Sequence, residues 1–125
     1  MDSKPRILVI DDDMNLRQTI MAILEEENYS TAGACNGEIA LKHMLSQSVD
    51  LIIVDIIMPD KDGIEVIMEV KEKYPDTKIL SLSGGGLIEA DDHLKSALAL
   101  GAHKTQVKPF KNSELVENVR FLLNN

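Results

Sequence analysis

Short runs of apolar, mostly β-branched residues alternate along this chain with longer segments in which apolar residues recur every three or four positions. Such runs are typical of buried strands, and the three-to-four spacing is typical of helices packed on one face. The predicted strands cover residues 7–10, 29–34, 51–54, 79–82 and 103–107, and the helical patterns cover residues 16–24, 40–45, 66–74, 87–98 and 115–123. Because parallel strands need a crossover between them, usually a helix, this alternation predicts an α/β fold with a parallel sheet and helices on both faces.

Length and composition indicate one globular domain over residues 1–125. With 44% hydrophobic residues, the 125-residue chain can bury one core and is too short for two ordinary domains. The formal net charge of −8, without any basic stripe, argues against direct nucleic-acid binding by this domain. The single cysteine, Cys35, cannot form an internal disulfide, and no segment resembles a secretory signal or a membrane span. We therefore expect a cytoplasmic protein that does not bind membranes.

Several residues suit the expected helix ends. Asp13 and Asn36 are typical N-caps for the first and second helices, and Asn112 or Ser113 can cap the last one. Gly101 suits the left-handed conformation that often follows a helix, here the fourth.

Polar residues stand at the carboxyl ends of four predicted strands. In chain order they are Asp11, Asp12 and Asp13, then Asp55, Ser83 and Lys108. The carboxyl ends of parallel strands lie along one edge of the sheet, where ligands of such folds bind. Three carboxylate positions, a hydroxyl and an ammonium are therefore expected to meet in one polar site.

The acidic cluster predicts a bound divalent cation. Carboxylates at close range repel one another unless a positive charge neutralises them. Oxygen ligands without nearby His or Cys favour Mg²⁺, with Mn²⁺ as an alternative ion. A carboxylate beside such an ion can attack phosphorus, while a lysine and a hydroxyl neutralise and hydrogen-bond the phosphoryl oxygens. The pattern thus indicates phosphoryl transfer to Asp55.

Four motifs carry a resemblance to a known family. They are "IDDD" at 10–13, "DIIMPDKDG" at 55–63, "LSG" at 82–84 and "VKPF" at 107–110. In this order and spacing they resemble the receiver domain of bacterial two-component response regulators, of the chemotaxis-regulator kind. The resemblance covers nearly the whole chain and implies a flavodoxin-like, doubly wound (βα)5 fold whose five parallel strands have the order 2-1-3-4-5. It also implies a signalling phosphoacceptor rather than an enzyme.

By position, the resemblance implies a metal site. Asp55 matches the phosphorylated aspartate, Asp12 a direct metal ligand, and Asp11 the neighbouring acid that binds the metal directly or through water. The backbone carbonyl of Ile57 matches a further ligand. Asp13 is expected to cap the first helix instead of binding metal.

The resemblance also assigns residues that act on the phosphoryl group. Ser83 matches the hydroxyl residue that hydrogen-bonds it, and Lys108 matches the lysine that pairs with it. Pro109 matches a proline whose preceding peptide is cis in receivers. Phosphorylation is then expected to reshape the surface of the fourth helix, fifth strand and fifth helix for a partner.

Two departures from the family pattern concern the switch and the phosphoryl lifetime. Thr105 stands where receivers usually carry an aromatic side chain that moves on phosphorylation. We predict that the glycine-rich loop beginning at Gly84 absorbs the change instead. Neither Ile57 nor Gly85 carries a side chain that could hold the attacking water, so slow autodephosphorylation is expected, together with self-phosphorylation from small donors.

Other interpretations of the same residues have less support. Asp11 and Asp12 could be acids at a helix N-terminus, but Asp55 and Lys108 at matching strand ends favour a site. A haloacid-dehalogenase-like phosphatase needs a second acid at position 57, where this chain has isoleucine. A flavodoxin-like flavin module needs a phosphate-binding loop after the first strand, where three aspartates would repel the flavin phosphate.

The resemblance also implies partners. The phosphodonor would be a sensor histidine kinase or a histidine phosphotransfer protein, and the signal would pass to a downstream protein or output domain. A phosphorylation-dependent dimer is a further expectation. The sequence fits both a standalone receiver and the regulatory domain of a larger response regulator or transcription factor.

Overall fold

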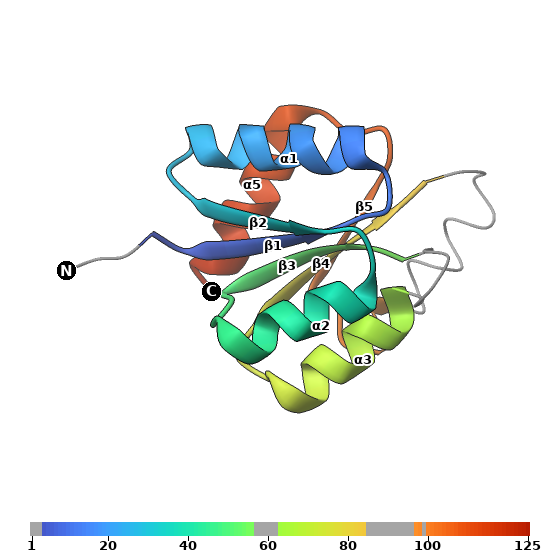
Figure 1. Ribbon diagram of the computed structural model, residues 1–125. Helices are drawn as coiled ribbons and strands as arrows, with labels where there is room; N and C mark the ends of the chain where they lie inside the picture. The colour runs from blue at the N-terminus through green and yellow to red at the C-terminus, as the bar shows by residue number, and fades with distance from the viewer. Residues whose placement is uncertain (1–3, 57–62, 85–96, 99) are drawn as a thin grey trace.

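The protein forms a five-stranded parallel sheet in the order β2-β1-β3-β4-β5 (Figure 1). The computed structural model describes residues 4–56, 63–84, 97–98 and 100–125. The strands are β1 (Arg6–Ile10), β2 (Ser30–Ala34), β3 (Leu51–Asp55), β4 (Lys78–Ser83) and β5 (Lys104–Val107). The helices are α1 (Met14–Glu26), α2 (Gly37–Ser46), α3 (Gly63–Lys73) and α5 (Asn112–Leu123). The predicted fold class and strand order are confirmed.

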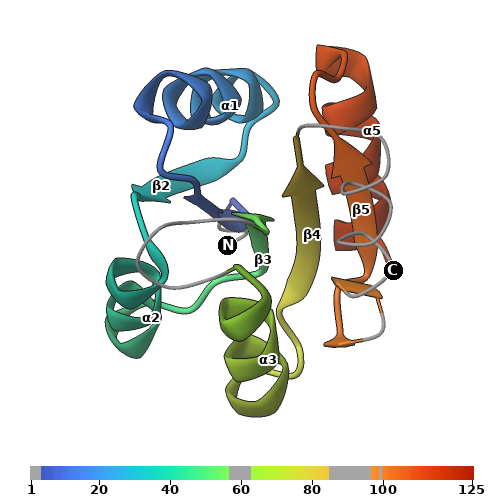
Figure 2. The ribbon, with the colours of Figure 1, turned by 90° about the vertical axis from the view of Figure 1, so that its right-hand side faces the viewer.

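Two layers of helices cover the sheet, with α1 and α5 on one face and α2 and α3 on the other (Figures 1 and 2). Side chains of β1 and β3 alternate between the two faces, so that Leu8 and Ile52 pack toward α2 and α3 while Val9 and Ile53 pack toward α1 and α5. All four are fully buried. Strands buried on both faces need apolar residues at every position, which explains the continuous apolar runs in the sequence.

Helix ends follow the predicted caps in two of three cases. The Asp13 carboxylate accepts a hydrogen bond from the Leu16 N–H at 3.2 Å, and the Asn36 side chain accepts one from the Ile39 N–H at 2.9 Å. The prediction that Asn112 or Ser113 caps α5 is wrong, because both lie within the helix.

The N-cap of α5 is Lys111. The Glu114 carboxylate, three residues further on, accepts a hydrogen bond from the Lys111 N–H at 3.2 Å. A glutamate at this position can satisfy the N-cap backbone without a capping hydroxyl or amide. The start of the helix is therefore set one residue earlier than the sequence suggested.

Most of the predicted fourth helix lies outside the described residues. Residues 97, 98 and 100 are helical, and the Gly101 N–H donates to the Ala97 carbonyl at 3.1 Å. Gly101 has a φ of 133°, a conformation that favours glycine. The predicted helix end at Gly101 is thus confirmed. In the part of the chain that the structure describes, no helix is long and apolar enough to cross a membrane.

His103 begins the pairing of β5 with β4 through both its backbone and its ring. Its N–H donates to the Ile79 carbonyl at 2.9 Å, and its Nδ1 accepts from the Ile79 N–H at 3.0 Å. Burial, and then the positive charges of Lys71 and Lys78, lower the pKa of His103 below its ordinary value of 6.5. The neutral ring is therefore the form that holds the edge of the sheet.

We predict a pH-dependent loss of stability that comes from His103. Because its pKa is lowered on folding, its contribution is present above pH 6.5 and is lost as the pH falls through the folded-state pKa. Between pH 7.5 and 5 the wild type should lose more stability than a variant without the titrating ring, by at most about 1 kcal/mol, the net value of one hydrogen bond. His103→Asn keeps an acceptor near Ile79 but does not titrate, and should lack this component of the loss.

Urea unfolding of wild type, His103→Asn and His43→Asn at both pH values measures the effect. His43→Asn removes a histidine without touching Ile79 and should follow the wild type. If His103→Asn loses as much stability as the wild type, the ring contact has no role in the pH response.

Candidate functional site

The strand register brings two aspartates from distant parts of the sequence to one edge of the sheet. Ile10 of β1 lies opposite Val54 of β3, so the residues that follow them, Asp11 and Asp55, come side by side. Asp55 in turn pairs with the residue before Ser83 in β4. The predicted meeting of strand-end residues therefore follows directly from parallel pairing.

Asp11, Asp12 and Asp55 form a cluster in which one oxygen from each carboxylate lies within 4.8 Å of the others. Asp11 is completely buried and Asp55 is 8% exposed, whereas Asp12 is exposed to solvent. Ligand oxygens lie about 2.1 Å from Mg²⁺, so two of them on one ion are at most about 4.2 Å apart. Small shifts would thus bring all three carboxylates onto one ion, and the all-oxygen set suits Mg²⁺.

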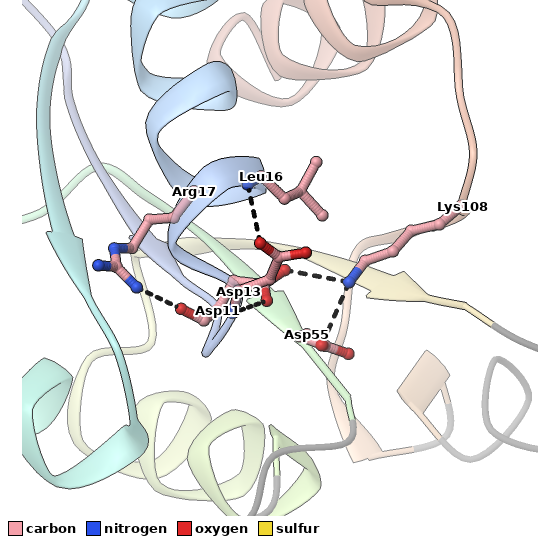
Figure 3. A network of polar contacts seen from close by, with 6 residues as sticks. All are labelled: Asp11, Asp13, Leu16, Arg17, Asp55 and Lys108. Carbon is pink, nitrogen blue, oxygen red and sulfur yellow. Dashed lines mark hydrogen bonds and ion pairs between the residues drawn. The ribbon is translucent and has the colours of Figure 1, made fainter.

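Lys108 lies between the two buried carboxylates (Figure 3). Its Nζ is 3.1 Å from Asp11 Oδ2 and 3.2 Å from Asp55 Oδ2. Burial alone would lower the pKa of Lys108, but the charges and hydrogen bonds of Asp55 and Asp11 outweigh it and raise the pKa above the ordinary value. Three carboxylates and one ammonium leave a formal charge of −2, which a divalent cation neutralises.

The backbone that follows β5 fixes the position from which the Lys108 side chain extends. The Lys108 N–H donates to the Ser83 carbonyl at 2.6 Å, and the Lys108–Pro109 peptide is cis, the geometry that the resemblance implied. Gly84 lies beside the lysine stem, and a Cβ at this position would stand 3.4 Å from Lys108 Cδ, an ordinary contact. The positions of Ser83, Gly84 and Lys108 are therefore linked.

Ser83 is 1% exposed, and its Oγ has no hydrogen-bond partner among the described residues. A buried hydroxyl without a partner costs about 1–3 kcal/mol, so native proteins rarely keep one without a reason. Ser81, two residues earlier on the same strand, is also buried, but its Oγ donates to the Lys104 carbonyl at 3.5 Å. Ser83, which follows the residue paired with Asp55, thus holds a donor that has no acceptor among the described residues.

Two further predicted site residues, Asp13 and Thr105, are described by the structure and do not belong to this cluster. Asp13 caps α1, as predicted. Thr105 is half-buried in β5 opposite Ser81, and its part in a switch stays a prediction. Ile57 and Gly85 lie outside the described residues.

Two residues of the site were not predicted from the sequence. A Cβ on Gly63, the first residue of α3, would lie 2.0 Å from the Asp55 carbonyl oxygen, so only glycine fits where the helix begins against β3. Arg17 of α1 donates from Nη1 to the Asp11 carbonyl at 2.8 Å. The glycine of the "DIIMPDKDG" motif could have been noticed, whereas a single arginine within a helical pattern gives no signal.

Comparison with known families identifies the family to which the chain belongs. Residues 7–120 match the family described as response regulator receiver domain. The chain belongs to this family. The resemblance identified from the four motifs is therefore confirmed, and the protein is a receiver domain with a signalling role.

Relatives of this receiver domain include transcriptional regulators. It is 36% identical over 121 residues to the transcriptional regulatory protein ResD of Bacillus subtilis and 38% identical over 117 residues to the probable transcriptional regulator ycf27 of Cyanidium caldarium. The matches cover 97% and 94% of this chain, but only 49% and 45% of those proteins. The chain thus spans about half the length of these relatives.

Solved structures agree with the fold. The receiver domain of NtrX from Brucella abortus matches with a TM-score of 0.88 and 30% identity, covering 95% of this chain and 98% of that one. The chemotaxis protein CheY4 of Vibrio cholerae matches with a TM-score of 0.84 and 29% identity over 95% of this chain and 98% of that one.

We predict that Ser83→Ala stabilises the unphosphorylated receiver domain by about 1 kcal/mol, because it removes a buried hydroxyl that has no partner. Ser81→Ala is the matched control on the same strand. It removes a hydroxyl that has an acceptor, and should leave stability unchanged or lower it. Urea unfolding measures both, and a clear loss of stability in Ser83→Ala would show that the hydroxyl is already satisfied.

Proposed function

We propose that this receiver domain accepts a phosphoryl group on Asp55 in a Mg²⁺-dependent reaction. The observation that carries the proposal is the Lys108 ammonium, which lies within 3.2 Å of carboxylate oxygens of both Asp11 and Asp55. Asp11 and Asp12 would hold the ion together with Asp55, and the Ile57 carbonyl is a further proposed ligand. When bound, Mg²⁺ would neutralise charge on the phosphoryl oxygens and on the carboxylates around them.

In the proposed reaction an Asp55 carboxylate oxygen attacks phosphorus, and the bond from phosphorus to the donor breaks. If the donor is a phosphohistidine, the electron pair returns to the ring nitrogen. Lys108 would then pair with a phosphoryl oxygen, and Ser83 Oγ would donate its unused hydrogen bond to another. The two groups therefore stabilise the product form as well as the transition state.

The proposed partners follow from the family. The donor is a sensor histidine kinase or a histidine phosphotransfer protein, and small phosphodonors can replace it. The proposed output surface comprises the predicted fourth helix, β5 and α5, and the described part of it exposes Leu98, Leu100, Val107 and Phe121. Such a surface suits a downstream protein, an output domain or, after phosphorylation, a second copy of the chain. We place the chain in the cytoplasm, as its single cysteine suggests.

The test of the phosphoacceptor role compares Asp55→Asn with Asp13→Asn. Each protein is incubated with a small phosphodonor and Mg²⁺, and its intact mass is measured. Wild type and Asp13→Asn, in which asparagine still caps α1, should gain a phosphate-sized adduct that Asp55→Asn lacks. EDTA should abolish the gain. An adduct on Asp55→Asn equal to that of the wild type would disprove the proposal.

We also propose that the phosphoryl group on Asp55 is long-lived, because the apolar side chain of Ile57 cannot hold the attacking water. Ile57→Asn supplies an amide that can orient it and should accelerate phosphate loss several-fold. Ile57→Val, which stays apolar, is the control and should match the wild type. Timed mass measurements after donor removal give the rates, and an unchanged or slower rate in Ile57→Asn would contradict the argument.

A further inference from the structure

Asp11 is held from two sides through its backbone. Its N–H donates to the Ala34 carbonyl of β2 at 3.1 Å, and its carbonyl accepts from Arg17 Nη1 of α1 at 2.8 Å (Figure 3). Its side chain is also engaged, because Oδ1 accepts from the Asp13 N–H at 2.9 Å and Oδ2 accepts from Lys108. Asp11 is completely buried. Without the Arg17 guanidinium, its carbonyl could form a hydrogen bond with water only if the loop between β1 and α1 moved.

The path of the arginine depends on a glycine in β2. Gly33 lies on the face of the strand toward α1, while its neighbours Ala32 and Ala34 pack toward the opposite layer. A Cβ on Gly33 would stand 3.1 Å from Arg17 Cδ, 3.2 Å from Arg17 Nε and 2.9 Å from Met21 Sδ. These contacts are tighter than side chains normally make, so with a larger residue Met21 Sδ would have to move and the Arg17 stem would have to give by at least a few tenths of an ångström.

We infer that Arg17 is a positioning residue for the metal site and that Gly33 keeps open the space through which it reaches Asp11. The inference rests on the proposed function, in which Asp11 helps to hold Mg²⁺. By fixing the Asp11 carbonyl, Arg17 fixes the direction in which the buried carboxylate faces Asp12 and Asp55. Groups that hydrogen-bond a metal-ligating side chain typically change metal affinity 10- to 100-fold when removed, and Arg17, which acts through the Asp11 backbone, is expected at the lower end of this range.

The direction of the change in Mg²⁺ affinity distinguishes a positioning role of Arg17 from an effect of its positive charge. A guanidinium near the cluster repels a divalent cation, so removal of its charge alone would tighten Mg²⁺ binding. Removal of a positioning contact would weaken binding instead. Arg17→Met keeps most of the stem while it removes the donor and the charge, so the direction of its effect is informative.

The experiment measures Mg²⁺ affinity and stability separately. Mg²⁺ is titrated into wild type, Arg17→Met, Gly33→Ala and the double variant, and the amide NMR shifts of Asp12 and Asp13 report binding. Urea unfolding in EDTA gives the stability without metal. Arg120→Met is the control for charge, because this variant also removes one positive charge from the protein. Arg120 pairs with Glu27 at the far end of α1.

Arg17→Met should weaken Mg²⁺ binding by about tenfold, and Gly33→Ala should also weaken it, by a smaller factor. The double variant should bind as Arg17→Met does, because the glycine acts only through the arginine. Arg120→Met should match the wild type. A purely structural role would lower the unfolding free energy and leave the Mg²⁺ dissociation constant unchanged.

Unchanged or tighter binding in Arg17→Met would overturn the inference, and so would an equal Gly33→Ala effect in both backgrounds. If Arg17→Met does not fold, Gly33→Ala decides alone, and wild-type affinity in that variant would refute the positioning role. A wild type that does not respond to Mg²⁺ at all would instead count against the proposed function.

Discussion

The ammonium of Lys108 between the carboxylates of Asp11 and Asp55 is the interaction on which the rest of the site depends. Two buried acids at adjacent strand ends repel each other, and removing the partner of a buried charge typically costs 3–5 kcal/mol. One ammonium against three carboxylates still leaves a formal charge of −2. Lys108 thus offsets part of the repulsion between the acids and leaves the site negative enough to attract a divalent cation.

The parallel sheet makes this arrangement possible. β1 and β3 are buried on both faces and lie in register, so that their apolar residues form the core and their last residues meet at one edge. Asp11, which follows β1, is then held by the Ala34 carbonyl of the neighbouring strand β2 and by Arg17 of α1. The acidic cluster is therefore connected to the packing of β2 and α1 through the short loop between β1 and α1.

Much of the fold and of the site could be predicted from the sequence, because both depend on local patterns and on strand ends. The strands and the converging aspartates, serine and lysine followed from periodicity and parallel topology, while the strand order came from the family resemblance. The N-cap of α5 was predicted wrongly because Glu114 reaches back to Lys111, a contact that competes with any capping hydroxyl. Gly33 and Arg17 could not be placed, since their contacts with each other and with the Asp11 carbonyl arise only when α1 packs on β2.

The most direct measurement of the central claim is a crystal structure of the protein with Mg²⁺ and beryllofluoride, a mimic of the phosphoryl group. We expect beryllofluoride on Asp55, Mg²⁺ on the carboxylates of Asp11, Asp12 and Asp55, and fluorine contacts from Lys108 Nζ and Ser83 Oγ. The Ser83 contact is informative because this hydroxyl is buried without a partner among the described residues. Beryllofluoride bound elsewhere, or Mg²⁺ absent from the three aspartates, would contradict the assignment of this site.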